Sequence, residues 1–420
     1  MAIACQGGGS HTAFTAGVLG RLLEADELTR SEIVGLSGTS GGAVCALLAW
    51  SALCDGDRRR AGQLLVEFWA DNAADGLGER LVNSWLLLGS MLQSHGLLPA
   101  VSPYQTPVSS VGMDQFRQML GRHVDFSRLD RDAAGRHPLL LLGAVDVRSG
   151  RFRAFNSRQE RITVDRVLAS AAIPTLFQAV EVDGGTYWDG LFSQNPPVRE
   201  LLDTHPDELW VVQVNPRERP TVPRTLLEIA DRRNELAGNL SLYQELAFIE
   251  KIDQLLEEGV LSPTGRYRRV MVRIIELPTS RLARAWGPAS KLDRSPRFLA
   301  ALIAEGRAQA EVFLSTLAFE RAWAARDADA ITGHFTDDVE LQSAAPFPSA
   351  RVQGDGRRAR EFVEAHLCES IAIDPDRKQI AGDRVTWSIR MRRADTVVRG
   401  MADVEISGAG VSSLRLGPAR

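Results

Sequence analysis

The apolar residues between positions 1 and 317 follow two alternating patterns. Short apolar runs predict strands at residues 1–6, 32–38, 208–216 and 267–277, a pair of strands within 136–155 and a β-hairpin at 179–192. Apolar residues at helical spacing, or apolar stretches rich in small residues, predict helices at 11–25, 40–53, 61–98, 161–174, 224–258 and 295–317. Strands that alternate with helices in this way are typical of an α/β fold.

The order of elements changes near residue 317. Residues 319–343 read as a helix, a short helix and a strand, and a further helix is predicted at 356–367. Three strands with alternating apolar residues then follow at 384–393, 397–408 and 410–416. We therefore predict two domains, at residues 1–315 and 316–420.

Composition narrows the possible partners and the compartment. The chain has 420 residues, 44% of them hydrophobic, which suffices for a large core and exceeds one ordinary domain. Its net charge is −4 and its arginines are scattered, so we do not expect it to bind nucleic acid. The chain shows no signal peptide and no apolar run of membrane-spanning length, so we expect a cytoplasmic protein. Its four cysteines lack metal-site spacing, and we expect reduced thiols and no metal.

The segment "GLSGTSGGAV" places Ser40 in a G-x-S-x-G pentapeptide between a predicted strand and a predicted helix. This pattern displays a nucleophilic serine on a sharp turn, here formed by Gly38, Thr39, Gly41 and Gly42. In a glycine-rich chain the same string also arises in an ordinary loop. It indicates catalysis only where a base and oxyanion donors lie close by.

A run of three glycines, Gly7, Gly8 and Gly9, ends the first predicted strand. The first two strands of a right-handed βαβ unit are neighbours, so this run and Ser40 should meet at the carboxyl edge of the sheet. Glycine amides at a helix N-terminus are suited to an oxyanion hole. The alternative is a phosphate-binding loop, but the glycine signatures of such loops are absent.

The base for Ser40 could be a histidine or a carboxylate. The chain has seven histidines: His11, His95, His123, His137, His205, His334 and His366. Of these only His205, in a loop before a strand, is placed as a triad histidine would be. Asp189 ends the aromatic strand of "YWDGLFSQNPPV" and could act directly as the base. Asp183, in "VDGG", lies where the hairpin must turn, which favours a structural role.

Three ordered blocks, "QGGGSHTAFTAGVL", "GTSGG" and "WDGLFSQNPPV", resemble the patatin-like phospholipases. The lead-in "ASAAIPTLFQAVEVDG" and the helix "RRNELAGNLSLYQELAFIEKIDQLL" extend the similarity over roughly residues 1–315. The resemblance implies a three-layer α/β sandwich with a mainly parallel central sheet. It also implies a Ser40–Asp189 dyad and oxyanion amides from Gly7, Gly8 and Gly9.

The function implied by this resemblance is hydrolysis of lipid acyl esters through an acyl-enzyme, with no metal or organic cofactor. The alternative is a catalytically weak protein of the same fold that binds lipids or another protein. The chain departs from the family pattern at three places. His11 and Thr12 stand where the family usually has Arg and Gly, and Leu191 stands where it has Gly or Ala.

The apolar segment at residues 80–101 could control access of a lipid or acyl-ester substrate. Its leucines, with Trp85 and Met91, could form a mobile cover or a surface for peripheral membrane contact. From periodicity alone, the segment favours the alternative of a packed core helix.

The tail from residue 316 resembles a SnoaL-like domain, a small α+β cone. The resemblance implies a ligand pocket or a homodimer formed through this domain, and the alternative is a degenerate scaffold. No Asp-His pair is clearly placed for catalysis, although His334, Asp337 and Asp338 lie together in the sequence. Fold alone assigns no activity.

Overall fold

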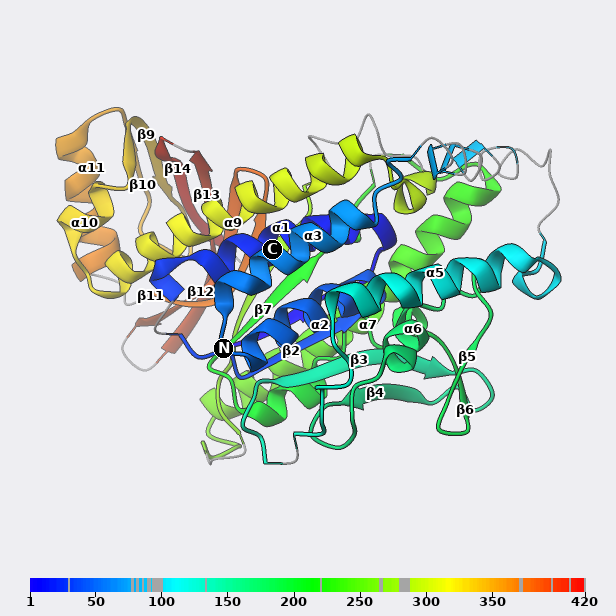
Figure 1. Ribbon diagram of the computed structural model, residues 1–420. Coiled ribbons are helices and arrows are strands. Elements are labelled where there is room, and N and C mark those ends of the chain that lie inside the picture. Colours follow the sequence, from blue (N-terminus) through cyan, green and yellow to red (C-terminus); the bar gives the residue numbers. More distant parts are fainter. Residues whose placement is uncertain are drawn as a thin grey trace. The chain divides into compact units, whose positions relative to one another are not determined.

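The computed structural model describes most of the chain as two compact units (Figure 1). It describes residues 1–28, 31–76, 79–80, 83–84, 87–88, 92, 101–132, 134–219, 221–263, 267–278, 288–369, 373–393, 396–407 and 409–418. One unit comprises residues 1–270 and 279–307, and the other comprises residues 271–278 and 308–420. The predicted boundary between residues 315 and 316 falls inside helix α9 (Pro296–Ala324), and that domain assignment stays a prediction.

The N-terminal unit contains a mixed sheet that is parallel at its centre. Its strand order is β7–β1–β2–β3–β6–β5, and β4 pairs with β3. Strands β7, β1, β2 and β3 are parallel, whereas β4, β5 and β6 join antiparallel at the β3 end. The bounds are β1 (Ala2–Cys5), β2 (Gly35–Thr39), β3 (Leu139–Asp146), β4 (Phe152–Asn156), β5 (Val180–Val182), β6 (Gly185–Asp189) and β7 (Glu208–Gln213).

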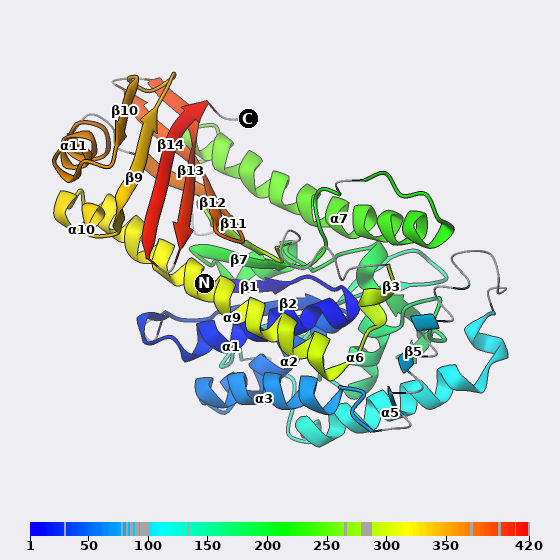
Figure 2. The same ribbon diagram turned by 90° about the horizontal axis from the view of Figure 1, so that it is seen from above.

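Helices cover both faces of this sheet (Figure 2). Helices α1, α2 and α3 lie on one side of β1 and β2, and α7 lies on the other. The bounds are α1 (Ala13–Glu24), α2 (Gly41–Cys54), α3 (Arg58–Asp71), α5 (Pro107–His123), α6 (Val164–Ala171) and α7 (Leu226–Glu257). The short helices are η1 (Gly9–Thr12), η2 (Asp26–Leu28), η3 (Pro103–Gln105), η4 (Gly190–Phe192), η5 (Arg199–Thr204) and η6 (Pro288–Leu292).

The sequences of α2 and α7 show why α2 is buried and where α7 begins. Helix α2 is apolar or small all round, as a fully buried helix requires. Helix α7 begins with a capping box, in which the Thr225 side chain and the Glu228 side chain each bond the other residue's amide.

Among the residues that the structure describes, no helix has the length and apolar character needed to cross a bilayer.

The C-terminal unit packs helices against seven strands in the order β10–β9–β14–β13–β12–β11–β8. Its strands are β8 (Met271–Glu276), β9 (Phe335–Ser343), β10 (Ala350–Gln353), β11 (Ile373–Ala381), β12 (Arg384–Arg393), β13 (Thr396–Ser407) and β14 (Gly410–Pro418). Its helices are the last part of α9, α10 (Ala328–Thr332) and α11 (Gly356–Phe362), which continues as the π-helix η7 (Val363–Glu369). The predicted order of helices followed by strands is confirmed, and so is the fold class.

Two features of the C-terminal unit were not apparent in the sequence. Strands β10 and β11 lack the alternation that identifies their neighbours. Strand β8 was expected before the boundary, yet it pairs in parallel with β11, about a hundred residues later in the chain. Local patterns identify strands but carry no information about such distant partners.

A buried ion-pair cluster lies inside the C-terminal unit. The Lys378 side chain is fully buried, and its Nζ lies 2.9 Å from Glu320 Oε1 and 2.7 Å from Thr316 Oγ1. Arg273 and the Trp387 indole also donate to the Glu320 carboxylate. Burial by itself would raise the pKa of Glu320, but Lys378 and Arg273 hold it below its usual value.

We expect Glu320→Gln to lower the free energy of unfolding by about 3–5 kcal/mol, because it leaves two buried cations without their shared anion. The matched control is Glu361→Gln, which breaks an exposed pair with Arg357 on α11 and should cost less than about 1 kcal/mol. Urea unfolding at neutral pH measures both. Equal stability of the two variants would contradict the structural role assigned to the cluster.

Candidate active site

Strand β3 brings the ends of two other strands together. Thr39, the last residue of β2, lies opposite Gly143 of β3, and Asp189, the last residue of β6, lies opposite Ala144. Strand β4 pairs with the other edge of this stretch of β3, so β2 and β6 follow one another along a single edge. The sheet register therefore places Ser40, which directly follows β2, beside Asp189.

Ser40 lies on a sharp turn with φ 57° and ψ −131°, between β2 and the first residue of α2. This backbone conformation is rare outside glycine and costs on the order of 1–3 kcal/mol. Its amide donates to the Ser170 carbonyl at 3.0 Å, which holds the turn. The turn is tightly packed: a Cβ on Gly42 would collide with the Cys5 carbonyl oxygen. The predicted strand-turn-helix around Ser40 is present.

Asp189 is buried at the end of β6, with 1% of its surface exposed. The Leu191 amide donates to its Oδ1 at 2.9 Å, and its carboxyl shares a side-chain hydrogen bond with Ser40. Burial raises the pKa of Asp189 to about 7, against the lowering effect of these two hydrogen bonds. Such a carboxyl gains and loses its proton near neutral pH, as a general base must.

The two other candidates for the base lie elsewhere. Asp183 is in the turn of the β5–β6 hairpin with φ 49°, and its exposed carboxylate pairs with Arg166 at 2.6 Å. His205 is exposed at the end of η5 in the left-handed conformation, with its amide bonded to Leu202. Within the described part of the chain, no hydrogen bond joins the side chain of Asp183 or His205 to Ser40.

The glycine run packs directly against the serine turn. A Cβ on Gly7 would lie 2.8 Å from the Ser40 Cβ, and one on Gly8 would lie 2.7 Å from Val214 Cγ2, so neither position has room for a side chain. The Gly7 amide donates to Asn195 Oδ1 at 2.7 Å, and the Gly7 carbonyl accepts from Asn215 Nδ2 at 3.0 Å. Both bonding groups of Gly7 are thus engaged in holding the loop.

His11 and Thr12, which depart from the family pattern, both support the glycine run. His11 is buried, and its Nε2 lies 2.9 Å from Ser290 Oγ. Burial, with Lys291 nearby, lowers the pKa of His11 to about 3, so the ring is neutral at physiological pH. Thr12 Oγ1 donates to the Gly9 carbonyl at 2.6 Å, and the Lys291 carbonyl lies against Gly9, whose φ is +59°.

Leu191, the third departure, fits because of a glycine on α7. A Cβ on Gly238 would lie 3.0 Å from Leu191 Cδ1, so the small residue on the helix makes room for the larger one after Asp189. The backbone amide of Leu191 still bonds the Asp189 carboxylate. The substitution therefore leaves the environment of the carboxyl intact.

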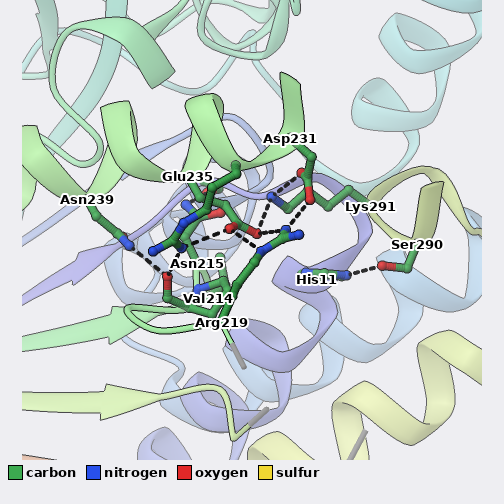
Figure 3. A network of polar contacts seen from close by, with 12 residues as sticks. His11, Val214, Asn215, Arg219, Asp231, Glu235, Asn239, Ser290 and Lys291 are labelled. Atoms are coloured by element: carbon green, nitrogen blue, oxygen red, sulfur yellow. Dashed lines mark hydrogen bonds and ion pairs between the residues drawn. The ribbon is translucent and has the colours of Figure 1, made fainter. Parts of the chain in front are cut away.

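A cluster of charged side chains lies near Asn215 and His11 (Figure 3). Asp231 and Glu235 of α7 are buried and together pair with Arg219 and Lys291; the Lys291 Nζ lies 2.8 Å from Asp231 and 3.2 Å from Glu235. Arg232 also pairs with Glu235, at 3.2 Å. Each of the two buried carboxylates is therefore paired with at least two cations.

Sequence reasoning missed the residues that hold the site in place. Asn195 follows the predicted hairpin, Asn215 lies at the end of the predicted strand 208–216, and each precedes a proline. A polar residue at the carboxyl edge of the sheet was therefore an available signal. Ser170 and Lys291 gave no local signal. The predicted cover at residues 80–101 lies mostly outside the described residues, including Trp85 and Met91.

Comparison with known proteins gave one family match and several structural similarities. Residues 3–202 match the model of the patatin-like phospholipase family. No curated protein matches the chain.

The similar solved structures are small proteins that align with the C-terminal region. An NTF2-like protein from Cytophaga hutchinsonii is 11% identical with a TM-score of 0.22, covering 25% of this chain and 87% of that one. An NTF2-like protein from Mesorhizobium loti is 18% identical with a TM-score of 0.23, covering 26% and 91%. A putative polyketide cyclase from Sinorhizobium meliloti is 20% identical with a TM-score of 0.21, covering 24% and 92%.

The raised pKa of Asp189 predicts that Asp189→Asn stabilises the protein above neutral pH. Between its unfolded pKa near 3.8 and its folded pKa of about 7, the unfolded chain releases a proton that the folded chain keeps. Stability of the wild type therefore falls over this range as pH rises, whereas the variant has no such loss. Thermal unfolding midpoints should agree near the acidic end and diverge in the variant's favour by about pH 8. A constant difference across this range would contradict the burial effect.

Proposed function

Because the chain carries a patatin-like phospholipase domain at residues 3–202, we propose that it hydrolyses lipid acyl esters with Ser40 as nucleophile and Asp189 as general base. The observation that supports this most directly is the hydrogen bond between the Ser40 side chain and the buried Asp189 carboxyl. A serine hydroxyl is a poor nucleophile until a neighbouring base accepts its proton. Asp189 is the residue positioned to do so.

The reaction then proceeds by two acyl transfers. Asp189 takes the Ser40 proton as Oγ bonds to the ester carbonyl carbon, and the tetrahedral intermediate collapses when Asp189 returns that proton to the departing alcohol. Water next gives a proton to Asp189 and attacks the acyl group on Ser40. The second intermediate releases the carboxylic acid as Ser40 regains its proton, so one ester and one water yield one acid and one alcohol.

The glycine run stabilises the negative charge of each intermediate. Gly7 was expected to be one of three donors, but its amide is bonded to Asn195, so we assign the oxyanion to the amides of Gly8 and Gly9 at the start of η1. Both residues are partly exposed, next to the serine turn. Loss of one oxyanion donor costs roughly 3–4 kcal/mol of barrier in other hydrolases.

We expect Ser40→Ala and Asp189→Asn each to lower kcat for a chromogenic acyl ester about a thousandfold or more. Because nucleophile and base act as one unit, the double variant should be scarcely slower than either single variant. Steady-state hydrolysis measures this, and a fluorophosphonate probe should label the wild type at Ser40. Circular dichroism establishes that each variant is folded.

The matched controls for these variants are Asp183→Asn and His205→Ala. Asp183 pairs with Arg166 at the surface and His205 ends η5, so both variants should keep turnover within about threefold of wild type. Loss of activity in His205→Ala with normal turnover in Asp189→Asn would instead establish a histidine base. A folded wild type that neither hydrolyses esters nor reacts with the probe would support the alternative of a lipid-binding protein.

The pH profile gives a further prediction. The base must be ionised, so kcat/KM for an uncharged ester should fall about tenfold per pH unit below pH 7, the pKa of Asp189 being about 7. Stopped assays between mildly acidic and mildly alkaline pH measure the profile. Full activity at a pH two units lower would show that the catalytic base is not this carboxyl.

A further inference from the structure

The first half of helix α7 differs from an ordinary surface helix, because its buried side chains are polar and its large apolar side chains are exposed, whereas the second half also buries Leu242, Leu246 and Ile249. Asp231, Glu235 and Asn239 are buried along its inner face. Five large apolar side chains are 41–71% exposed on its outer face: Leu226, Ile229, Leu236, Leu240 and Phe248. These positions fall on one side of a helix with 3.6 residues per turn. We call this set the outer face of α7.

The inward polar residues have partners that account for their burial. Asn239 bonds the Gln6 side chain and the Pro216 carbonyl, at 3.0 Å each. Asp231 and Glu235 belong to the charged cluster described above. These contacts of the inner face fix the rotation of α7 about its own axis. The apolar side chains on the opposite side of the helix are therefore left exposed. An apolar strip of this length on a surface indicates an interaction.

The charges around the outer face favour a negatively charged partner. Four of the five acidic residues between positions 224 and 251 are buried or partly covered, and Glu250 is exposed. Glu228 caps the helix, and Glu245 accepts from the Val198 amide at 2.7 Å. The basic residues Arg224, Arg233 and Lys251 are exposed. With 3.6 residues per turn, Arg233 and Lys251 lie on the same side of the helix as the outer face, whereas Glu250 lies about 100° away from them.

The inner face of α7, opposite the outer face, packs against the candidate active site. Helix α7 contacts η4, whose Leu191 lies against the buried Gly238. The Leu191 amide bonds the Asp189 carboxyl, so α7 supports the site with one face and exposes apolar side chains on the other. Figure 2 shows α7 as an outer layer on its side of the N-terminal unit's sheet.

We propose that the outer face of α7 docks the protein onto the surface of a lipid membrane. This proposal rests on the proposed function, since a lipid acyl hydrolase must reach substrates held in an aggregate. Membrane docking accounts for the two properties of the face together: apolar side chains enter the boundary of the acyl layer while flanking cations meet anionic head groups.

The test uses the full-length protein and vesicles of phosphatidylcholine with phosphatidylglycerol as the minority lipid. The double variant Leu240→Gln/Phe248→Gln removes two apolar side chains from the outer face. The matched control, Val66→Gln/Val111→Gln, changes two comparably exposed apolar residues on α3 and α5. Vesicle flotation should show binding weakened roughly tenfold or more for the first variant and unchanged for the second. Arg233→Gln should weaken binding to these vesicles more than to pure phosphatidylcholine.

Hydrolysis of a water-soluble ester, measured alongside, separates this proposal from the proposed function. Vesicle binding without ester hydrolysis by the wild type would overturn the catalytic assignment and leave the docking surface supported. Equal binding by the outer-face variant and the control would overturn the docking proposal. So would sedimentation of the wild type as a dimer that the outer-face variant converts to a monomer, because the occupant would then be a second copy of the chain.

Discussion

The hydrogen bond between Ser40 and Asp189 depends on how β2 and β6 share one edge of β3. That arrangement requires a close backbone approach: a Cβ on Gly190, directly after β6, would lie 2.6 Å from the carbonyl of Gly143 within β3, so there is no room for a side chain at position 190. The same packing excludes water from the carboxyl, and burial is what raises its pKa to about 7. The strand register that brings Ser40 next to Asp189 therefore also buries the Asp189 carboxyl and raises its pKa.

Helix α7 is the second element on which the site depends. Its inner face supplies Asp231 and Glu235 to the charged cluster near Asn215 and His11 and Gly238 to the space that Leu191 fills. Burying these carboxylates is costly unless cations compensate, and Arg219 and Lys291 do so. Because the polar side of the helix is committed to the site, its apolar side is left facing solvent, which is the basis of the docking proposal.

His11 and Thr12, which depart from the family pattern, make contacts that help to hold the glycine run. Neutral His11 bonds Ser290, while cationic charge near the loop comes from Arg219 and Lys291, which lie far away in the sequence. Thr12 ties the Gly9 carbonyl in place. The loop is therefore held by side chains from several elements rather than by one basic residue within it.

The sequence by itself determined the elements and the local turns, because helix and strand periodicity, the elbow around Ser40 and the hairpin at Asp183 are set by neighbouring residues. It also marked Asp189, since a carboxylate at a strand end next to glycine stands out in the chain. Only the tertiary structure decided that the Gly7 amide bonds Asn195, that Ser170 holds the serine turn, and that β8 pairs with β11. These contacts join residues far apart in the chain, and their energies depend on burial and register, which no local pattern encodes.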